Sequence, residues 1–284
     1  FTAVAVMQLV EAGKIDLHAP LQQYIPGLSP KLAKGLTVHH LLKQQSGLPV
    51  FIEDITTVDI MDISPGELLA EINRSERHFE PGKKHEYSNI NYNLLAMAIE
   101  HTSGMNYARY LQEKIFTPLH MTSSGNERLI NIPANRAIGY RTINGVKRRV
   151  QNVTAYALGT GDIYSTAEDL LKWSNALHRG NLLSEKSRAL LFDGGPEDWG
   201  YYGYGFRIQP YESAQSLLPA GTLIRHGGTM NGFVSNYHYY KEDDLTVILL
   251  SNFRNTPIRA LTYRIKEIAL KASQSARKKK YEDE

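Results

Sequence analysis

The sequence predicts an α+β protein, in which an antiparallel sheet is flanked by helices and joined to a mostly helical region. Three observations predict this class. Apolar residues recur at helical spacing through the first two thirds of the 284 residues, extended apolar segments follow, and one more helical pattern comes last. We therefore expect one domain over 1–272, with a helical region at about 18–180, strands at about 200–252, a last helix at about 256–272 and a charged tail over 273–284.

Composition and charge narrow the function classes. The chain is 42% hydrophobic and 21% charged, as in soluble globular proteins, and it is long enough for a sizeable core. Its net charge of +3 is too small to indicate nucleic-acid binding. The absence of cysteine excludes disulfides, a cysteine nucleophile and thiolate metal ligands. No apolar run in the sequence is long enough to span a membrane.

The chain opens in a segment that reads as the end of a buried helix. Residues 1–12 are apolar nearly all round, and Gly13 is a good C-terminal stop. No N-cap residue precedes Phe1, and a charged amine inside a buried helix is unfavourable. We therefore expect further residues upstream of Phe1.

Capping residues set the limits of the other helices. Thr37 is an N-cap candidate for a short helix through Leu42, and Ser64-Pro65-Gly66-Glu67 has the form of a capping box with proline at the first helical position. Ser165-Thr166-Ala167-Glu168 is a second capping box, whose helix is expected to end at Gly180. Two further helices are expected at about 106–115 and 182–192, and a hairpin across 143–146.

Extended segments dominate after residue 200. Four strands are expected, over 202–209, 222–225, 233–240 and 245–251, with a turn at 241–244 between the last two. Thr256-Pro257 opens the final helix, whose apolar face is expected to hold Ile258, Leu261, Ile265 and Ile268. The charged run over 277–284 is expected to be solvated and disordered.

The first candidate site lies at the start of a well-anchored helix. Pro81-Gly82 marks a tight turn, and Ser88 or Asn89 can cap the helix, whose buried face carries Tyr92, Leu95, Ala96 and Ile99. Tyr87 and Asn89 are thus held in place without being fully buried, which suits catalytic groups. A packed phenol and a capping asparagine are the common structural roles of such residues, so this stretch alone leaves both readings open.

The second candidate is the stretch Arg225-His226-Gly227-Gly228-Thr229-Met230-Asn231-Gly232, expected between two strands. The adjacent glycines Gly227 and Gly228 let a ligand approach the backbone closely. The N–H of Thr229 can then contribute to an oxyanion hole, and His226 can supply a hydrogen bond or a proton. Read alone, the same residues also fit a glycine-rich hairpin with an incidental histidine.

Other catalytic and cofactor motifs are absent from the sequence. There is no G-x-S-x-G elbow and no H-E-x-x-H, and no helix with a phosphate site follows the glycines after His226. His39 and His40 are adjacent, so they cannot share a helical face and are expected to be ordinary helix-surface groups. We therefore expect neither a cofactor nor a metal.

Several stretches together resemble the serine β-lactamase and penicillin-binding-protein superfamily, in its class C-like branch of β-lactamases, D,D-peptidases, D-aminopeptidases and esterases. Residues 1–17 look like the helix that follows the S-x-x-K motif, and 79–89 resemble F-x-P-G-x-x-x-x-Y-S-N, the second catalytic motif. His226-Gly227-Gly228 resembles the third motif. Further similar stretches are LLKQQSGLP at 41–49, with Gln44 and Gln45 in place of His-Thr, STAEDLLKW at 165–173, and LLSN at 249–252.

The resemblance implies a β-lactamase/transpeptidase-like fold and acyl-transfer chemistry, in which a serine attacks an amide or ester carbonyl and water hydrolyses the acyl-enzyme. Tyr87 would shuttle protons, and Asn89 would hold the motif lysine or the substrate amide. The stretch from His226 to Thr229 would line the site and give one oxyanion donor. An adjacent ammonium would lower the pKa of Tyr87 from the usual value of about 10, which would make the phenol a useful base.

The chain departs from the family pattern at its start. The serine and lysine of S-x-x-K are expected about five and two residues before Phe1, outside the sequence. Residues 275–278 match S-x-x-K as a string but follow the last helix in a charged tail, so we treat the match as chance. The sequence as it stands is thus predicted to be inactive. The one or two strands that precede the motif in the family would be missing from the sheet, whose edge would accept that segment or a partner strand.

Two functions remain open. The first is a serine hydrolase of esters, D-amino-acid peptides or β-lactams. The second is a non-catalytic relative that binds peptidoglycan-like or acyl ligands, or a partner chain. His226 stands where β-lactamases usually have lysine, which favours esters or D-peptides over β-lactams unless Arg225 or another cation pairs with the substrate carboxylate. The resemblance also suggests export from a bacterial cell.

Overall fold

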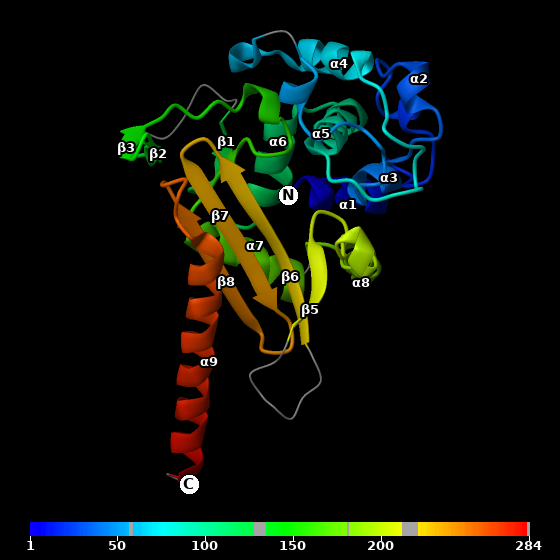
Figure 1. The fold of residues 1–284 in the computed structure, drawn as a ribbon. Coiled ribbons are helices and arrows are strands. Elements are labelled where there is room, and N and C mark those ends of the chain that lie inside the picture. Colours follow the sequence, from blue (N-terminus) through cyan, green and yellow to red (C-terminus); the bar gives the residue numbers. More distant parts are fainter. Residues whose placement is uncertain (57–58, 128–134, 181, 212–220, 283–284) are drawn as a thin grey trace. The chain divides into compact units, whose positions relative to one another are not determined.

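The computed structural model describes residues 1–56, 59–127, 135–180, 182–211 and 221–282 (Figure 1). The chain divides into two compact units. We call them the helical unit, which is Phe1–Arg136 with Val153–Arg207, and the sheet unit, which is Ala137–Asn152 with Ile208–Glu284. The first unit is mostly helical and the second holds a four-stranded sheet, so the α+β class is confirmed.

The helical unit contains short and medium-length helices. They are α1 Thr2–Glu11, α2 Pro30–Ala33, α3 Val38–Leu42, α4 Pro65–Arg74, α5 Asn89–Ser103, α6 Tyr107–Leu111 with a π-helical continuation over Gln112–Phe116, α7 Ala167–Arg179 and α8 Glu185–Leu191. Two short strands, β1 Gly125–Asn126 and β4 Ile163–Tyr164, pair antiparallel. The helix α8 is shorter than the predicted 182–192.

The core of this unit forms where α1 packs on α5. In α1, seven of the residues Thr2–Leu9 are buried, which confirms the expected central helix. The helix α5 buries a run of apolar side chains, including Ile90, Leu94, Leu95, Ala98 and Ile99. It ends at Gly104, which adopts a left-handed conformation with φ of 71°, as expected for a C-terminal stop.

Side-chain caps fix most helix starts where the sequence predicts them. The Ser64 hydroxyl accepts from the Glu67 N–H, and the Glu67 carboxylate accepts from the Ser64 N–H, so this capping box is confirmed. The second box is shifted by one residue. The cap of α7 is Thr166, whose hydroxyl accepts from the Asp169 N–H, because the Ser165 hydroxyl instead lies 2.7 Å from that of Ser124.

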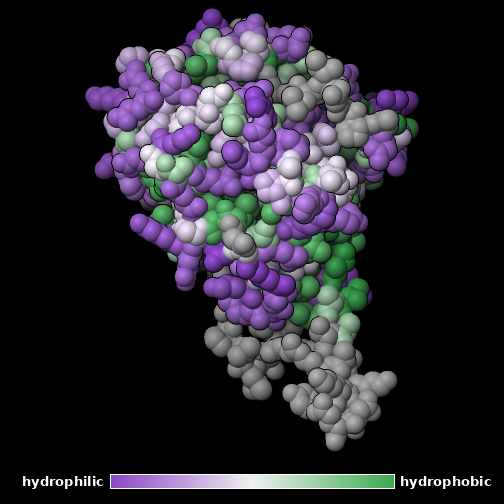
Figure 2. Space-filling model, turned by 180° about the vertical axis from the view of Figure 1, so that it is seen from behind, coloured by the Kyte–Doolittle hydropathy of each residue, from purple (hydrophilic) through white to green (hydrophobic). Residues whose placement is uncertain are grey.

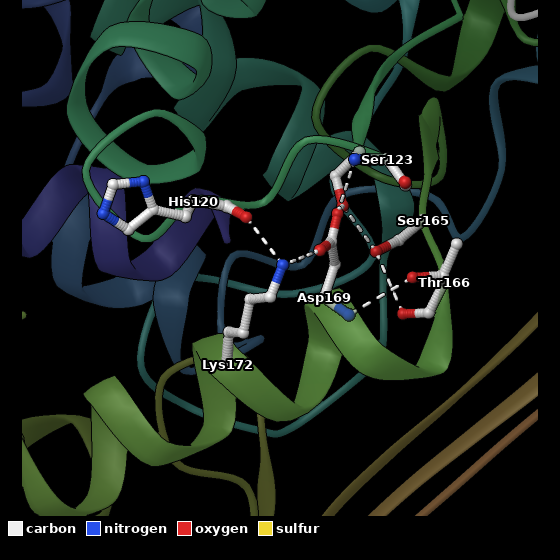
Figure 3. A network of polar contacts seen from close by, with 7 residues as sticks. His120, Ser123, Ser165, Thr166, Asp169 and Lys172 are labelled. Carbon is white, nitrogen blue, oxygen red and sulfur yellow. Dashed lines mark hydrogen bonds and ion pairs between the residues drawn. The ribbon is translucent and has the colours of Figure 1, made fainter.

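Asp169 joins the first turn of α7 to the segment before β1 (Figure 3). Its Oδ2 accepts from the Ser123 N–H at 2.8 Å and from the Ser124 hydroxyl at 2.9 Å. Its Oδ1 forms an ion pair with Lys172 Nζ at 2.7 Å, and Lys172 also donates to the His120 carbonyl at 2.6 Å. The carboxylate is buried, so this network holds two segments distant in sequence against each other.

The sheet unit is built on strands in the order β5-β6-β7-β8 (Figure 1). These strands are β5 Arg207–Tyr211, β6 Gly221–Met230, β7 Phe233–Tyr240 and β8 Leu245–Ser251. The β6–β7 and β7–β8 pairs are antiparallel, and the bounds of β7 and β8 match the prediction. The predicted hairpin also forms, from β2 Tyr140–Ile143 and β3 Val146–Arg149.

Two strand predictions were wrong. The strand β5 begins at Arg207 instead of Tyr202, because the chain turns at Gly205, where φ is +78° and the Gly203 N–H bonds the Phe206 carbonyl. The strand β6 continues through Met230 instead of ending at Arg225, since its second half pairs residue by residue with β7. The glycines after His226 therefore lie within a strand and not in a connection.

The final helix, α9, spans Ile258–Glu282, directly after Thr256-Pro257. It continues past the predicted end near 272, since the following residues contain no glycine or proline and are rich in helix formers. The disorder expected over 277–284 is therefore wrong as far as Glu282.

The face of α9 that packs on the sheet also differs from the prediction. Thr262 is fully buried and bonds Asn236 of β7 at 2.9 Å, and Lys266 lies over the rings of Tyr211 and Tyr240. The predicted apolar face is instead largely exposed, at 42% for Leu261, 40% for Ile265 and 58% for Ile268. Figure 2 shows apolar surface, in green, along the side of the molecule where α9 runs.

Candidate active site

Tyr87 lies just before α5, and Asn89 is the first residue of that helix. Four backbone hydrogen bonds join this stretch and the turn before it to the loop over residues 44–50. They run from the N–H groups of His78, Gly82, Glu86 and Asn89 to the carbonyls of Gly47, Gln45, Gln44 and Val50, over 2.7 to 3.0 Å. Two loops that are far apart in sequence thus fix the backbone on both sides of Tyr87.

Gln44 is the side chain that anchors the start of α5. It is fully buried, and its Oε1 accepts from the Ser88 N–H at 2.9 Å and from Asn91 Nδ2 at 2.6 Å. The Ser88 hydroxyl is also turned inward and donates to the Pro49 carbonyl at 2.5 Å. Ser88 therefore occupies the N-cap position without a side-chain cap, because its hydroxyl is used to hold the loop.

Gly47 is required for the two loops to meet. Its φ is +77°, and a Cβ built on it would lie 2.3 Å from the Phe79 carbonyl oxygen, which belongs to backbone and cannot swing away. Gly47→Ala should therefore destabilise the protein by about 2–3 kcal/mol in urea unfolding. Gly35→Ala is the matched control, because Gly35 has a similar φ of +73° with nothing within 4 Å, and should cost only about 1 kcal/mol. Equal losses at the two positions would contradict the clash.

Tyr87 lies in a cluster of tyrosines. Its ring meets that of Tyr202 edge to face, with 6.1 Å between centroids. Tyr92 hydrogen-bonds with Tyr202, and its hydroxyl also donates to the Leu42 carbonyl at 3.3 Å. Burial raises the pKa of Tyr202 and of Tyr92, and Tyr87 raises both further, whereas the hydrogen bond with Tyr92 lowers the pKa of Tyr202. These two phenols are therefore neutral hydrogen-bonding groups, and one cation opposes the effect of burial on both Tyr87 and Tyr202.

That cation is Arg207. Its guanidinium lies over the Tyr202 ring, 5.4 Å from the centroid, and donates to the Gly200 carbonyl at 2.7 Å. Burial raises the pKa of Tyr87, and the charge of Arg207 opposes this shift. Desolvation of the phenol thus outweighs the charge of Arg207. The lowered pKa expected from the sequence depends on the ammonium of the motif lysine, which is expected before Phe1, so that expectation stays a prediction.

A second polar cluster surrounds His39, which sequence reasoning placed on a helix surface. His39 is half-buried, and its Nδ1 lies 2.6 Å from the Tyr204 hydroxyl. Burial lowers the pKa of His39 to about 4, with His18 and His40 adding to the effect. His39 is thus neutral at pH 7. The buried Lys43 bonds the Asp193 carbonyl and lies over the Tyr204 ring, which completes the cluster.

The second candidate stretch lies in the sheet unit, in the outer half of β6. His226 is half-buried, whereas Gly227, Gly228 and Thr229 are exposed. The Nδ1 of His226 lies 2.8 Å from the Gly227 carbonyl oxygen, which assigns the proton to Nδ1. A Cβ on Gly228 would lie 2.5 Å from the hydroxyl oxygen of Ser235, the residue opposite it on β7, so glycine keeps this face of the strand open.

The strand register separates His226 from Arg225. Arg225 pairs with His238 of β7, whose ring contacts Tyr263 of α9 with 5.5 Å between centroids. Successive side chains of a strand point to opposite faces, so Arg225 faces α9 and His226 faces away from it. β-Lactamases usually have a lysine at the position of His226. Because Arg225 lies on the opposite face of the sheet, its charge cannot replace the charge of that lysine.

The structure thus brings Tyr87 and Asn89 together in the helical unit, and His226, Gly227, Gly228 and Thr229 together in the sheet unit. Sequence reasoning missed Tyr202 and Arg207 as neighbours of Tyr87, and gave Gln44 no role beyond a departure from the family pattern. The alternation of tyrosine and glycine over 201–205 was the available signal for Tyr202.

Among the described residues, no group of three His, Asp or Glu side chains is placed to hold a metal ion. None of the described helices has the length and apolar character needed to cross a membrane.

A family model described as Beta-lactamase matches residues 1–271. The chain belongs to the Beta-lactamase family. PbpX of Bacillus subtilis (strain 168) is 32% identical over 259 residues, which cover 89% of this chain and 60% of PbpX. Penicillin-binding protein 4* of the same organism is 27% identical, over 89% of this chain and 58% of its own length. The chain therefore spans about three fifths of the length of these curated relatives.

Solved structures similar to this chain confirm the fold. The D-amino acid amidase from Ochrobactrum anthropi SV3, complexed with L-phenylalanine amide, is 26% identical, with a TM-score of 0.80 over 97% of this chain and 81% of that one. A penicillin binding protein from Bacillus halodurans is 28% identical, with a TM-score of 0.77 over 95% and 82%. The β-lactamase/transpeptidase-like fold predicted from the motifs is thereby confirmed.

Proposed function

We propose that the natural protein is a serine hydrolase that forms an acyl-enzyme with small amide or ester substrates of D-amino acids. Membership of the Beta-lactamase family supports the reaction class. The observation that carries the proposal is the doubly anchored turn before α5, which holds Tyr87 next to a cation and leaves its phenol only partly buried.

Each candidate residue has a role in this proposal. Tyr87 accepts the proton of the attacking serine and returns it to the leaving group. Asn89 holds the motif lysine or the substrate amide. The N–H of Thr229 donates to the developing oxyanion, and Gly227 and Gly228 let the carbonyl approach the strand. The strand β6 has ten residues and β5 five, so part of the β6 edge extends beyond β5 and can receive a ligand (Figure 1).

Amide or ester substrates are favoured over β-lactams for two reasons. His226 supplies no fixed positive charge for a substrate carboxylate, and Arg225 points to the opposite face of the sheet. The amidase from Ochrobactrum anthropi SV3, which acts on D-amino acid amides by its name, also shares this fold. We propose that the nucleophilic Ser-x-x-Lys precedes Phe1 and that the protein is exported from a bacterial cell, as the resemblance implies.

Covalent labelling tests the proposed function. The natural protein should react with a fluorescent fluorophosphonate at one serine in a Ser-x-x-Lys sequence, located by peptide mass spectrometry, and should hydrolyse D-alanine p-nitroanilide faster than the L isomer. Residues 1–284 alone should do neither. The absence of both labelling and hydrolysis in the natural protein would sink the enzyme proposal. Retained binding of a fluorescent penicillin in that case would favour the non-catalytic alternative.

Removal of the Arg207 charge should move the pH dependence of acylation. Arg207 opposes the rise in the pKa of Tyr87, so Arg207→Gln should raise that pKa and shift the rising limb of the kcat/KM profile to higher pH. The loss in rate at neutral pH should be smaller than in a variant without the Tyr87 hydroxyl. Arg207→Lys keeps the charge and should keep the limb near its original position. A profile that moves equally in both variants would show that Arg207 acts through packing on Tyr202.

A further inference from the structure

The β2–β3 hairpin of the sheet unit carries a concentration of positive charge that the proposed reaction does not use. Residues 137–152 include Arg141, Lys147, Arg148 and Arg149 and contain no aspartate or glutamate. All four cationic residues are exposed, and none of them forms an ion pair with a carboxylate of the described residues. The hairpin forms a two-stranded sheet of its own beside one end of the four-stranded sheet (Figure 1).

The register of the hairpin places like charges directly opposite each other. Arg141 pairs with Arg148, and Ile143 pairs with Val146 next to the Asn144-Gly145 turn. Directly opposed like charges destabilise a two-stranded ribbon. Aliphatic side chains that stay exposed to water contribute no hydrophobic stabilisation. Ile143 is 42% exposed and Val146 50% exposed. Both pairs lie on one face of the ribbon. We call this face the hairpin face, and it consists of Arg141, Arg148, Ile143 and Val146.

The hairpin is fixed firmly to the end of the sheet. The Tyr140 N–H donates to the Asn252 carbonyl at 2.8 Å, and the Thr142 N–H donates to Asn255 Oδ1 at 2.9 Å. On the side opposite the hairpin face, Lys147 lies over the rings of Tyr140 and Phe253, at 4.7 and 5.1 Å. One side of the ribbon is thus held by the protein, and the hairpin face is presented outward.

We propose that the hairpin face docks on a lipid bilayer that contains anionic phospholipid. Anionic headgroups would offset the repulsion between Arg141 and Arg148, and the acyl boundary would cover Ile143 and Val146. A soluble polyanion would satisfy the arginines and leave the aliphatic tip in water, so the apolar pair favours the bilayer.

Docking in this way would bring β6 close to the membrane surface. Asn231, in the β6–β7 turn, lies 3.4 Å from Arg141 through Oδ1 and donates to the Gln151 carbonyl at 2.9 Å. The turn directly follows the part of β6 that carries His226 to Thr229. The hairpin face would therefore hold the candidate oxyanion strand within a few side-chain lengths of the headgroups.

Vesicle sedimentation tests this inference on the natural protein. Binding to vesicles of equal parts phosphatidylglycerol and phosphatidylcholine in 0.1 M NaCl should exceed binding to phosphatidylcholine alone. Arg141→Gln with Arg148→Gln should weaken the partition about 25-fold, or about fivefold for each basic residue near an anionic surface. Ile143→Ser with Val146→Ser should weaken it about tenfold at unchanged charge. The control Lys14→Gln with Lys34→Gln removes the same charge from exposed positions of the helical unit and should have little effect.

Three outcomes would overturn the proposal. The first is equal binding to the two kinds of vesicle, or none to either. The second is an equal loss of vesicle binding in the lysine control and in the arginine variant, which would show that binding depends only on the net charge of the protein. The third is competition by soluble inorganic polyphosphate together with no effect of the serine substitutions, which would make the hairpin face a polyanion site. Circular dichroism of each variant confirms that the fold is retained.

Discussion

Replacing Tyr87 with phenylalanine is expected to lower the rate of acyl-enzyme formation by about 10²- to 10⁴-fold, the range for loss of a positioned general acid or base. Phenylalanine keeps the ring that packs edge to face on Tyr202 and removes only the hydroxyl. The backbone on both sides is held by hydrogen bonds to residues 44–50, so the variant should retain the geometry of the turn. Burst kinetics of the natural protein with a chromogenic ester measure the acylation rate directly.

The pH profile gives a second readout for the same variant. Burial raises the pKa of Tyr87, so the phenol is protonated at neutral pH and becomes a phenolate base only as the pH rises. Acylation should increase towards alkaline pH in the natural protein, and this increase should be missing in the phenylalanine variant. Tyr24→Phe is the control, because the Tyr24 hydroxyl accepts from the Asp16 N–H and belongs to no candidate site. Unchanged acylation in Tyr87→Phe would remove Tyr87 from the mechanism.

Features encoded by neighbouring residues could be predicted from the sequence. The Ser64 capping box, the Gly104 stop and the Asn144-Gly145 hairpin each depend on side chains within a few positions of one another. The limits of β7 and β8 were also predicted, because a turn-forming charged run separates two β-branched and aromatic segments. Local chemistry decides these features, so the sequence pattern is sufficient for them.

The surroundings of Tyr87 could not be predicted in the same way. Gln44, Tyr202 and Arg207 come from segments far from Tyr87 in sequence, and spacing along the chain carries no information on their approach. The effect of Arg207 on the pKa of Tyr87 was missed for this reason. Two competing effects, desolvation and a distant cation, set it, and only the tertiary structure shows which one is larger.

The errors in β6 and α9 have a common cause. Glycines after His226 read as a turn by local propensity, yet pairing with β7 holds them in a strand. The periodic apolar residues of α9 read as its buried face, yet the sheet contacts Thr262 through Asn236, and Lys266 through the rings of Tyr211 and Tyr240. In both elements the neighbouring strand decides the outcome, and tertiary pairing overrides a correctly read local pattern.

Asp169→Ala is expected to have the largest effect on stability, about 3–5 kcal/mol in urea unfolding. The carboxylate is 2% exposed and receives hydrogen bonds from the Ser123 N–H and the Ser124 hydroxyl, in addition to its ion pair with Lys172. Alanine would leave both donors without this acceptor and break the link between α7 and the segment before β1. Glu168→Ala removes a carboxylate from the same first helical turn and serves as the control, with an expected loss below about 1 kcal/mol.

The pH dependence of stability separates the charge of Asp169 from its size. Burial acts to raise the pKa of this carboxyl, but the hydrogen bonds from Lys172, Ser123 and Ser124 outweigh it, so the folded-state pKa lies below the usual 3.8. A depressed pKa stabilises the folded protein above the unfolded-state value and loses that contribution as the pH falls through the folded-state value. The stability difference between the natural protein and Asp169→Asn should therefore be full near neutral pH and shrink below about pH 4. A difference that stays constant down to the acid transition would show that Asp169 acts as a neutral acceptor and not as a charge.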